Sequence, residues 1–356
     1  MNFQQVQVHS DVALTSWRTV AKLYQSYFTG LVLYVSSRHG PAKAAALTYE
    51  VFCQQRQERF LPGLRKLGID GLPHAVAAAQ YHYLSNHIGG VPVQYMYESD
   101  RKAWIRYPAP RWIWSGTALC GIPPEVSRAM LAGWHAQNGV SLNNPRLGFV
   151  CTKQAVDGQS GLEGYYFEYD RDLEPHERLR FARQEDAPDF DLESAPVLPT
   201  TEWPIARLAK ANRNYAMEYV KTALTASIQV FGPDEAGHVL MMTGRMIGMQ
   251  FYHEVAVELG FHPDGTPAQF GRFIQALCQA QGDTCEVTTE GDVPIITQAS
   301  WSLLNDLAVH PAMTSAWRGL LSGAMDAHQH RWSLESPNGL ETGMEPFVWR
   351  ICRKAR

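Results

Sequence analysis

Two similar stretches of sequence, far apart in the chain, constrain the fold more than any other feature. Residues 161–171 read Gly-Leu-Glu-Gly-Tyr-Tyr-Phe-Glu-Tyr-Asp-Arg, and residues 343–353 read Gly-Met-Glu-Pro-Phe-Val-Trp-Arg-Ile-Cys-Arg. The Gly, Glu and Arg residues recur at the same spacing, and the apolar positions stay apolar. Aromatic and β-branched residues dominate after each Gly, which predicts a turn followed by a strand. If each stretch closes one structural unit, the chain contains one fold twice.

Further matches between the two halves occur at one constant interval. They pair Gly40-Pro41 with Gly232-Pro233, Leu67-Gly68 with Leu259-Gly260, and Gly90 with Gly282. The matches fall on predicted helix breaks and caps, where Gly and Pro have specific backbone roles. We therefore predict an α+β fold made of two tandem copies of a helix-plus-antiparallel-sheet domain, which form a pseudo-dimer. The alternative is two unrelated α+β halves that share common turn chemistry.

The region between the two halves is acidic and carries several prolines. Residues 183–203 have low hydrophobicity and contain Pro188, Pro196 and Pro199, which is typical of a linker. The length of 356 residues suits about two domains of roughly 150 residues each. The predicted organisation is a first α+β repeat at 1–182, a linker at 183–203 and a second α+β repeat at 204–356.

Apolar spacing and turn residues predict the elements of the first repeat. Helices are expected where apolar residues recur every three or four positions, and strands where aromatic and β-branched residues cluster. The predicted helices are 11–37, 41–67, 73–86 and 123–137, and the predicted strands are 91–98, 103–107, 146–152 and 165–170.

Composition excludes several classes of protein. The net charge is -4 with 19% charged residues, so there is no basic footprint for nucleic acid. No run of roughly 18 apolar residues exists, which argues against a membrane span. The start is polar and does not resemble a signal peptide. Six Cys without a Cys-x-x-Cys pair indicate free thiols in a reducing, cytoplasmic compartment.

The stretch before the first predicted hairpin is the second motif. Residues 79–90 read Ala-Gln-Tyr-His-Tyr-Leu-Ser-Asn-His-Ile-Gly-Gly. Together with the 161–171 stretch, this pattern resembles the 2-aminothiazoline-4-carboxylate hydrolase-like family and the related four-vinyl-reductase-type ligand-binding domains. Residues 27–171 carry the resemblance, and residues 219–353 carry a weaker second copy. The resemblance implies helices packed on an antiparallel sheet around an apolar ligand pocket.

The chain departs from this family at its cysteines. Members often have Cys-Pro after the second hairpin strand, whereas residues 108–110 here read Pro-Ala-Pro. Members also tend to have Cys shortly after the Gly-x-Glu site, where residues 165–167 and 347–349 here are aromatic or aliphatic. A thiol-dependent or Cys-ligated site is therefore not carried over.

Glu163 is the first candidate for catalysis, and Glu345 is its counterpart in the second repeat. A carboxylate half-buried among aromatic rings has a raised pKa, which suits a general acid or base. It could also bind a metal ion. The alternative is a turn residue that faces water or forms a salt bridge with Arg171 or Arg353.

His82 and Asn86 are the next candidates, because residues four apart share one face of a helix. A His beside an amide could hold a carbonyl substrate or a water molecule. The alternative is a partly buried His whose partner is the hairpin backbone. The matching positions in the second repeat are Ile274 and Cys278, so chemistry here would belong to the first repeat alone.

Aromatic residues are plentiful around the predicted hairpin and could hold a planar ring. The alternative is an ordinary aromatic core. The predicted substrate-binding residues are Tyr95, Trp104, Trp112 and Tyr165.

No metal site is assigned from the sequence. The densest set of potential ligands is Asp326-Ala-His328-Gln-His330, but the two His would diverge on a helix. An exposed helix end is the simpler interpretation. Cys278 and Cys285 flank Gly282 and are interpreted as buried thiols. A divalent ion such as zinc or iron remains an open option that the sequence does not require.

These features lead to two hypotheses of function. The first, implied by the resemblance, is a soluble small-molecule hydrolase that acts on a C–N bond of a heterocycle or amide. Glu163 would be the base, His82 would orient or polarise the substrate, and the aromatic residues would hold the ring. The second is a non-catalytic, sensor-like small-molecule-binding module. Both imply a small-molecule partner, no nucleic acid and no membrane, with a homo-oligomer as a further option.

Overall fold

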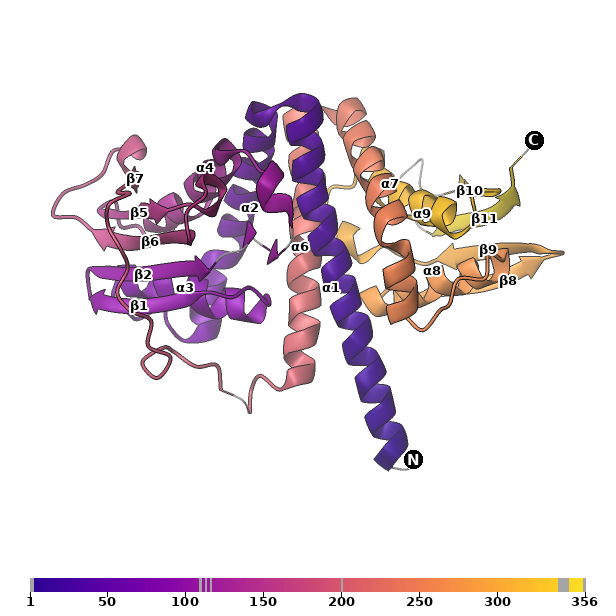
Figure 1. Ribbon diagram of the computed structural model, residues 1–356, viewed down its shortest axis with the longest axis horizontal. Helices are drawn as coiled ribbons and strands as arrows, with labels where there is room; N and C mark the ends of the chain where they lie inside the picture. Colours follow the sequence, from indigo (N-terminus) through magenta and orange to yellow (C-terminus); the bar gives the residue numbers. More distant parts are fainter. Residues whose placement is uncertain are drawn as a thin grey trace. The chain divides into compact units, whose positions relative to one another are not determined.

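The computed structural model describes residues 3–108, 111–112, 114–115, 117–199, 201–338 and 346–354, without side chains at 3–10, 111–118 and 337–338. The fold is mixed α+β (Figure 1). The chain divides into two compact units. We call Val35–Pro204 the middle unit, and Met1–Tyr34 together with Ile205–Arg356 the terminal unit.

Glycine and proline set the ends of the first long helices, as predicted. Helix α1 (Phe3–His39) stops at Gly40, which has φ 85°. Pro41 then begins α2 (Pro41–Leu67), because proline suits the first turn of a helix. Gly68 ends α2 in the left-handed conformation that glycine adopts without a Cβ clash. Helix α3 (His74–Ile88) follows Pro73.

The next predicted helix, 123–137, is shorter in the structure. Helix α4 (Pro124–Gly133) ends before Trp134, and the chain continues as a 3-10 turn, η2 (His135–Gln137), and the short helix α5 (Asn138–Ser141). Gly133 packs closely on α2, since a Cβ there would lie 2.8 Å from the carbonyl oxygen of Tyr49.

The middle unit contains one five-stranded sheet in the order β1-β2-β6-β5-β7. All its neighbours are antiparallel except β7, which pairs parallel to β5. Helix α3 packs against β1, β2 and β6. The strands are β1 (Gln94–Ser99), β2 (Lys102–Pro108), β5 (Leu147–Lys153), β6 (Gly161–Glu168) and β7 (Leu179–Phe181).

The remaining elements of the middle unit are short. They are β3 (Arg111–Trp112), β4 (Trp114–Ser115), η1 (Thr117–Gly121), η3 (Ala155–Asp157) and η4 (Pro175–Glu177).

The 161–171 stretch differs from its prediction in one respect. A turn was expected before a strand at 165–170, but β6 already begins at Gly161, opposite Pro108 of β2. Glu163 therefore lies inside a strand. Gly164 permits this pairing, because a Cβ there would lie 2.3 Å from the carbonyl oxygen of Val150. The corresponding Gly343 and Glu345 lie outside the described residues.

The terminal unit contains a four-stranded antiparallel sheet in the order β10-β11-β9-β8. Helix α8 packs on β8 and β9, and α9 contacts β10. The helices are α6 (Ile205–Phe231), α7 (Pro233–Glu258), α8 (Pro267–Gln281), α9 (Pro311–Gln329) and the 3-10 turn η5 (Ser302–Leu304). The strands are β8 (Cys285–Glu290), β9 (Val293–Gln298), β10 (Trp332–Asn338) and β11 (Phe347–Arg353).

Helix α1, up to Tyr34, packs with the C-terminal part of the chain. The Tyr27 hydroxyl donates a hydrogen bond to the Leu240 carbonyl oxygen at 2.9 Å, and the Phe28 ring lies 5.3 Å from that of Tyr219. The predicted first repeat, 1–182, therefore does not coincide with one compact unit of the structure.

Helices α7 and α9 cross at very short range, because glycines face the partner backbone on both. A Cβ at Gly248 of α7 would lie 2.1 Å from the Leu320 carbonyl oxygen, and one at Gly323 of α9 would lie 2.0 Å from the Arg245 carbonyl oxygen. In the part of the chain that the structure describes, every helix is too short or too polar to cross a bilayer.

Candidate functional site

Strand β6 places the predicted site residues on two opposite faces of the middle sheet. Successive strand residues point to alternate faces, so Glu163 and Tyr165 share one face and Tyr166 points to the other. Trp104 is paired with Tyr165 in the register of β2 and β6, and it shares the Glu163 face. His82 comes from α3 and stacks on Tyr166. The structure therefore does not bring Glu163 and His82 together.

The Glu163 carboxylate is buried and accepts four hydrogen bonds. Arg106 Nε donates to Oε2 at 2.6 Å. Oε1 accepts from Thr152 Oγ1 at 2.9 Å, Lys153 Nζ at 3.0 Å and the Ala187 backbone N–H at 3.2 Å. Only 2% of Glu163 is exposed, so its negative charge is balanced by protein groups.

These donors determine the protonation state of Glu163. Burial pushes the pKa of this carboxyl upward, but the hydrogen bonds from Arg106, Lys153, Thr152 and Ala187 outweigh burial and hold the pKa below its ordinary value. The sequence predicted a raised pKa, or a salt bridge with Arg171. In the structure Arg171 pairs with Glu177 instead. A carboxylate with four donors is poorly suited to accept another proton.

His82 lies in a buried polar cluster on the other face of the sheet. Its Nε2 is 3.1 Å from Asn138 Nδ2, which also donates to the Tyr166 hydroxyl at 3.0 Å. The same hydroxyl is 2.7 Å from His135 Nδ1. The imidazole rings of His82 and His135 stack at 4.1 Å. Asn86 bonds to the backbone carbonyl of His82 at 2.7 Å rather than to its ring.

Both histidines of this cluster are neutral near pH 7. Burial lowers the pKa of His135 to about 3. Burial and the neighbouring His135 hold the pKa of His82 well below its ordinary value. Asn138 Oδ1 is buried and has no hydrogen-bond partner among the described residues. The cluster combines neutral acceptors with one unused carbonyl oxygen.

His135 and Asn138 were missed at the level of sequence, because 123–137 reads as one continuous helix. Their placement depends on the break at Trp134, which turns η2 and α5 back toward the sheet. No short motif marks these residues, and polar neighbours such as Gln137 and Asn144 leave them without distinction in the sequence.

The three predicted aromatic residues whose side chains the structure describes, Tyr95, Trp104 and Tyr165, do not lie in one group. Trp104 and Tyr165 pack together at 4.5 Å, and Lys102 Nζ lies 4.8 Å and 4.3 Å from their ring centres. Tyr95 instead accepts a hydrogen bond from Gln80 of α3 at 3.4 Å. Trp112 lies in β3, and its side chain is outside the described residues.

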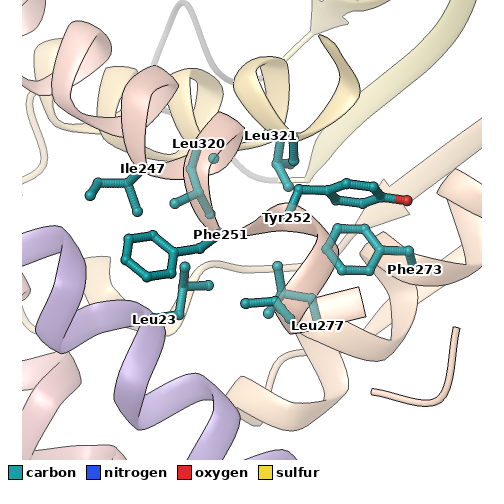
Figure 2. A pocket seen from close by; sticks show the side chains of 11 residues that line it. Leu23, Ile247, Phe251, Tyr252, Phe273, Leu277, Leu320 and Leu321 are labelled. Carbon is teal, nitrogen blue, oxygen red and sulfur yellow. The ribbon is translucent and has the colours of Figure 1, made fainter. Parts of the chain in front are cut away.

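A narrow apolar pocket lies within the terminal unit (Figure 2). Its cavity volume is about 10 Å³, which is close to the space that one water molecule needs. The lining residues come from α1, α7, α8 and α9: Leu23, Ile247, Gly248, Phe251, Tyr252, Val255, Phe273, Leu277, Leu320, Leu321 and Ala324.

The hydroxyl of Tyr252 forms its hydrogen bond outside the pocket. It lies 2.5 Å from His328 Nδ1, while His328 Nε2 lies 2.9 Å from the Thr266 carbonyl oxygen. A carbonyl oxygen only accepts, so Nε2 carries the hydrogen and Nδ1 accepts from the tyrosine. Figure 2 shows this hydroxyl pointing outward, with apolar side chains between α1 and α9. The pocket wall is therefore apolar.

The Asp326–His330 segment does not assemble a metal site. Asp326 pairs with Arg245 and with Lys354, the latter at 2.8 Å. Within the described ranges, no three His, Cys, Asp or Glu side chains gather as ligands. His328 is buried rather than exposed at a helix end, which corrects the simpler interpretation of the sequence.

Cys278 and Cys285 are both buried free thiols, as predicted. Their mutual hydrogen bond and burial raise the pKa of Cys278 well above its ordinary value. A thiol with such a pKa is a poor nucleophile and a poor metal ligand at neutral pH.

Comparison with protein-family models, curated proteins and solved structures found no match to this chain.

Proposed function

We propose that this chain binds a small apolar molecule in the pocket of the terminal unit, without chemical turnover. The observation that carries this proposal is the apolar wall shared by α1, α7, α8 and α9. Such a site favours an alkyl or aryl group, because transfer of apolar surface from water contributes roughly 25 cal/mol per Å². This corresponds to the binding-module alternative considered from the sequence, with the site in the terminal unit instead of at the aromatic residues of the first repeat.

The small cavity limits how the ligand is accommodated. A volume of about 10 Å³ admits no more than one water-sized group unless side chains rotate. Leu23, Phe251 and Leu277 are labelled around the cavity in Figure 2, and changes in their rotamers would enlarge it. We expect a slender ligand whose apolar part enters first.

Binding can be tested by displacement of an apolar fluorescent probe, N-phenyl-1-naphthylamine, with a series of n-alkanols. Leu277→Phe fills the pocket and should weaken alkanol binding about tenfold. Leu84→Phe is the control, because Leu84 is a buried leucine of α3 in the middle unit and does not line this pocket. Absence of saturable displacement in the unmodified protein, or equal effects of both changes, would contradict the proposal.

The C–N hydrolase stays a prediction that rests on the resemblance. In this hypothesis Glu163 would hold Arg106 and Lys153 in place rather than accept a proton, since both cations already bind it. Turnover of small heterocycles and amides by Glu163→Gln tests the original role. Unchanged turnover would remove Glu163 from the mechanism.

The tandem duplication is also a proposal, and the sheets support it. The order β1-β2-β6-β5 in the middle unit corresponds to β8-β9-β11-β10 in the terminal unit. Gly40 and Gly232 precede equivalent helices with φ of 85° and 78°. We infer that the two sheets descend from one repeated domain. Whether the chain also forms a homo-oligomer is a prediction that its native mass tests.

A further inference from the structure

The face of the middle sheet that carries Glu163 is covered by a segment without regular structure. We call residues 185–190, Glu-Asp-Ala-Pro-Asp-Phe, the acidic segment. Beneath it lies a buried cluster of Met96, Trp104, Val150 and Tyr165, against which Ala187 and Phe190 pack. Figure 1 shows the chain after β7 passing across this sheet. The stretch that the sequence predicts as a linker is therefore bound to the sheet over these residues.

The sheet contacts the acidic segment through both its side chains and its backbone. The Tyr165 hydroxyl donates to Glu185 Oε1 at 3.2 Å, and Lys153 pairs with Asp186. The Ala187 N–H donates to Glu163 Oε1 at 3.2 Å. Arg106 Nη2 donates to the carbonyl oxygens of Ala187 and Pro188, each at 3.5 Å. Glu163 therefore orients Arg106 and Lys153 toward the backbone and the acidic side chain of the segment.

The charges of the two surfaces meet at an ion pair between Lys153 of the sheet and Asp186 of the segment. The other two cations on this face pair within the sheet, Lys102 with Glu98 and Arg106 with Glu163. Backbone hydrogen bonds, paired charges and an aromatic anchor are the usual elements of peptide recognition. Asp186 is largely exposed, with 79% of its side chain accessible, so its ion pair is screened and weak. The segment is therefore held mainly by its backbone hydrogen bonds with Glu163 and Arg106 and by the packing of Phe190.

We propose that the Glu163 face of the middle sheet is a docking surface for acidic peptide segments that carry an aromatic residue four positions after an acidic one. Residues 185–190 occupy this surface in cis. A segment of the same pattern in another protein binds once the cis segment is displaced. The surface thus gives the chain a protein partner in addition to its proposed small-molecule ligand.

The test uses the full chain and a fluorescein-labelled peptide with the sequence of residues 182–192. The double variant Asp186→Asn/Phe190→Ser loosens the cis segment, and it should bind the peptide at least tenfold more tightly than the unmodified chain does. Adding Lys153→Gln should weaken that binding about tenfold. The control is the same peptide with Ser in place of Phe190 and Asn in place of Asp186. Equal binding of both peptides, or of both proteins, would overturn the proposal.

A second measurement keeps the proposal testable if the double variant does not fold. In the unmodified chain, 0.5 M NaCl should accelerate cleavage by Glu-C protease after Glu185, because salt screens the pairs that hold the segment. Cleavage after the exposed Glu193 is the internal reference. If salt leaves the ratio of the two cleavage rates unchanged, the segment does not exchange and the docking surface is not available.

Discussion

At the scale of single residues, side chains that alternate between the two faces of strand β6 form two separate buried polar centres. Glu163 and Tyr166 are three positions apart in β6 and point to opposite faces of the sheet. Around Glu163, cationic side chains surround a carboxylate. Around Tyr166, neutral histidines lie next to a hydroxyl. Each centre is hydrogen-bonded, which offsets the free-energy cost of burying polar groups.

Removing the charge of Glu163 should destabilise the middle unit. Glu163→Gln leaves Arg106 and Lys153 with an amide where they had a carboxylate, and loss of one partner of a buried pair costs roughly 3 kcal/mol. Urea unfolding measures the loss. Glu177→Gln breaks the more exposed pairs with Arg171 and Arg180 and should cost much less. Equal effects of the two changes would show that the Glu163 pairs add no more to stability than the exposed pairs of Glu177.

The buried histidines should make stability fall as the pH is lowered. Unfolded histidine has a pKa of about 6.5, whereas His135 has a folded pKa of about 3. Between these values the unfolded state binds more protons, so stability is lost as pH falls, by at most roughly 1.4 kcal/mol per pH unit. Urea midpoints at pH 7.5 and 5.5 test this, because carboxyl groups contribute little there.

The variants for this measurement are His135→Gln and His176→Gln. The first should reduce the loss of stability on acidification, while the second replaces an exposed histidine of η4 and is the control for the substitution itself. A pH dependence that survives His135→Gln in full would assign the effect to other groups.

At the scale of elements, close approach of the two backbones at glycines joins α7 to α9. Gly248→Ala places a Cβ 2.1 Å from the Leu320 carbonyl oxygen, and separating the helices should cost about 1–3 kcal/mol. Gly237→Ala is the control on the same helix, where the nearest atom is 3.6 Å away. That change should stabilise α7 by up to about 1 kcal/mol, since Ala is the better helix former. Thermal unfolding of both variants measures the difference, and equal stability would contradict the close crossing.

At the scale of the whole molecule, residues up to Tyr34 belong to the terminal unit. Phe28 is fully buried and packs on Tyr219 of α6, so Phe28→Ala should destabilise that unit by roughly 3–5 kcal/mol. Hydrogen exchange should accelerate in α6 and α7 and change little in α2 to α4. Equal acceleration in both sets of helices would show that the units do not unfold separately.

The sequence by itself predicted most of the longer helices and strands of the first repeat, because local chemistry decides them. Gly40-Pro41 and Gly68 set helix ends through backbone conformation alone, and the first hairpin follows from its aromatic strands and charged turn. The mixed α+β fold follows from the same signals.

Only the tertiary structure decided which residues meet. The face of the sheet to which each β6 side chain points depends on the register in which β6 pairs with β2. The sequence did not reveal this register, so Glu163 and His82 were predicted to lie together, whereas they lie on opposite faces of the sheet. His135 and Asn138 join His82 through the helix break at Trp134, and the 185–190 segment reaches Glu163 across 24 residues of sequence. Such contacts arise from packing between segments that are distant in the sequence, and local sequence patterns do not predict that packing.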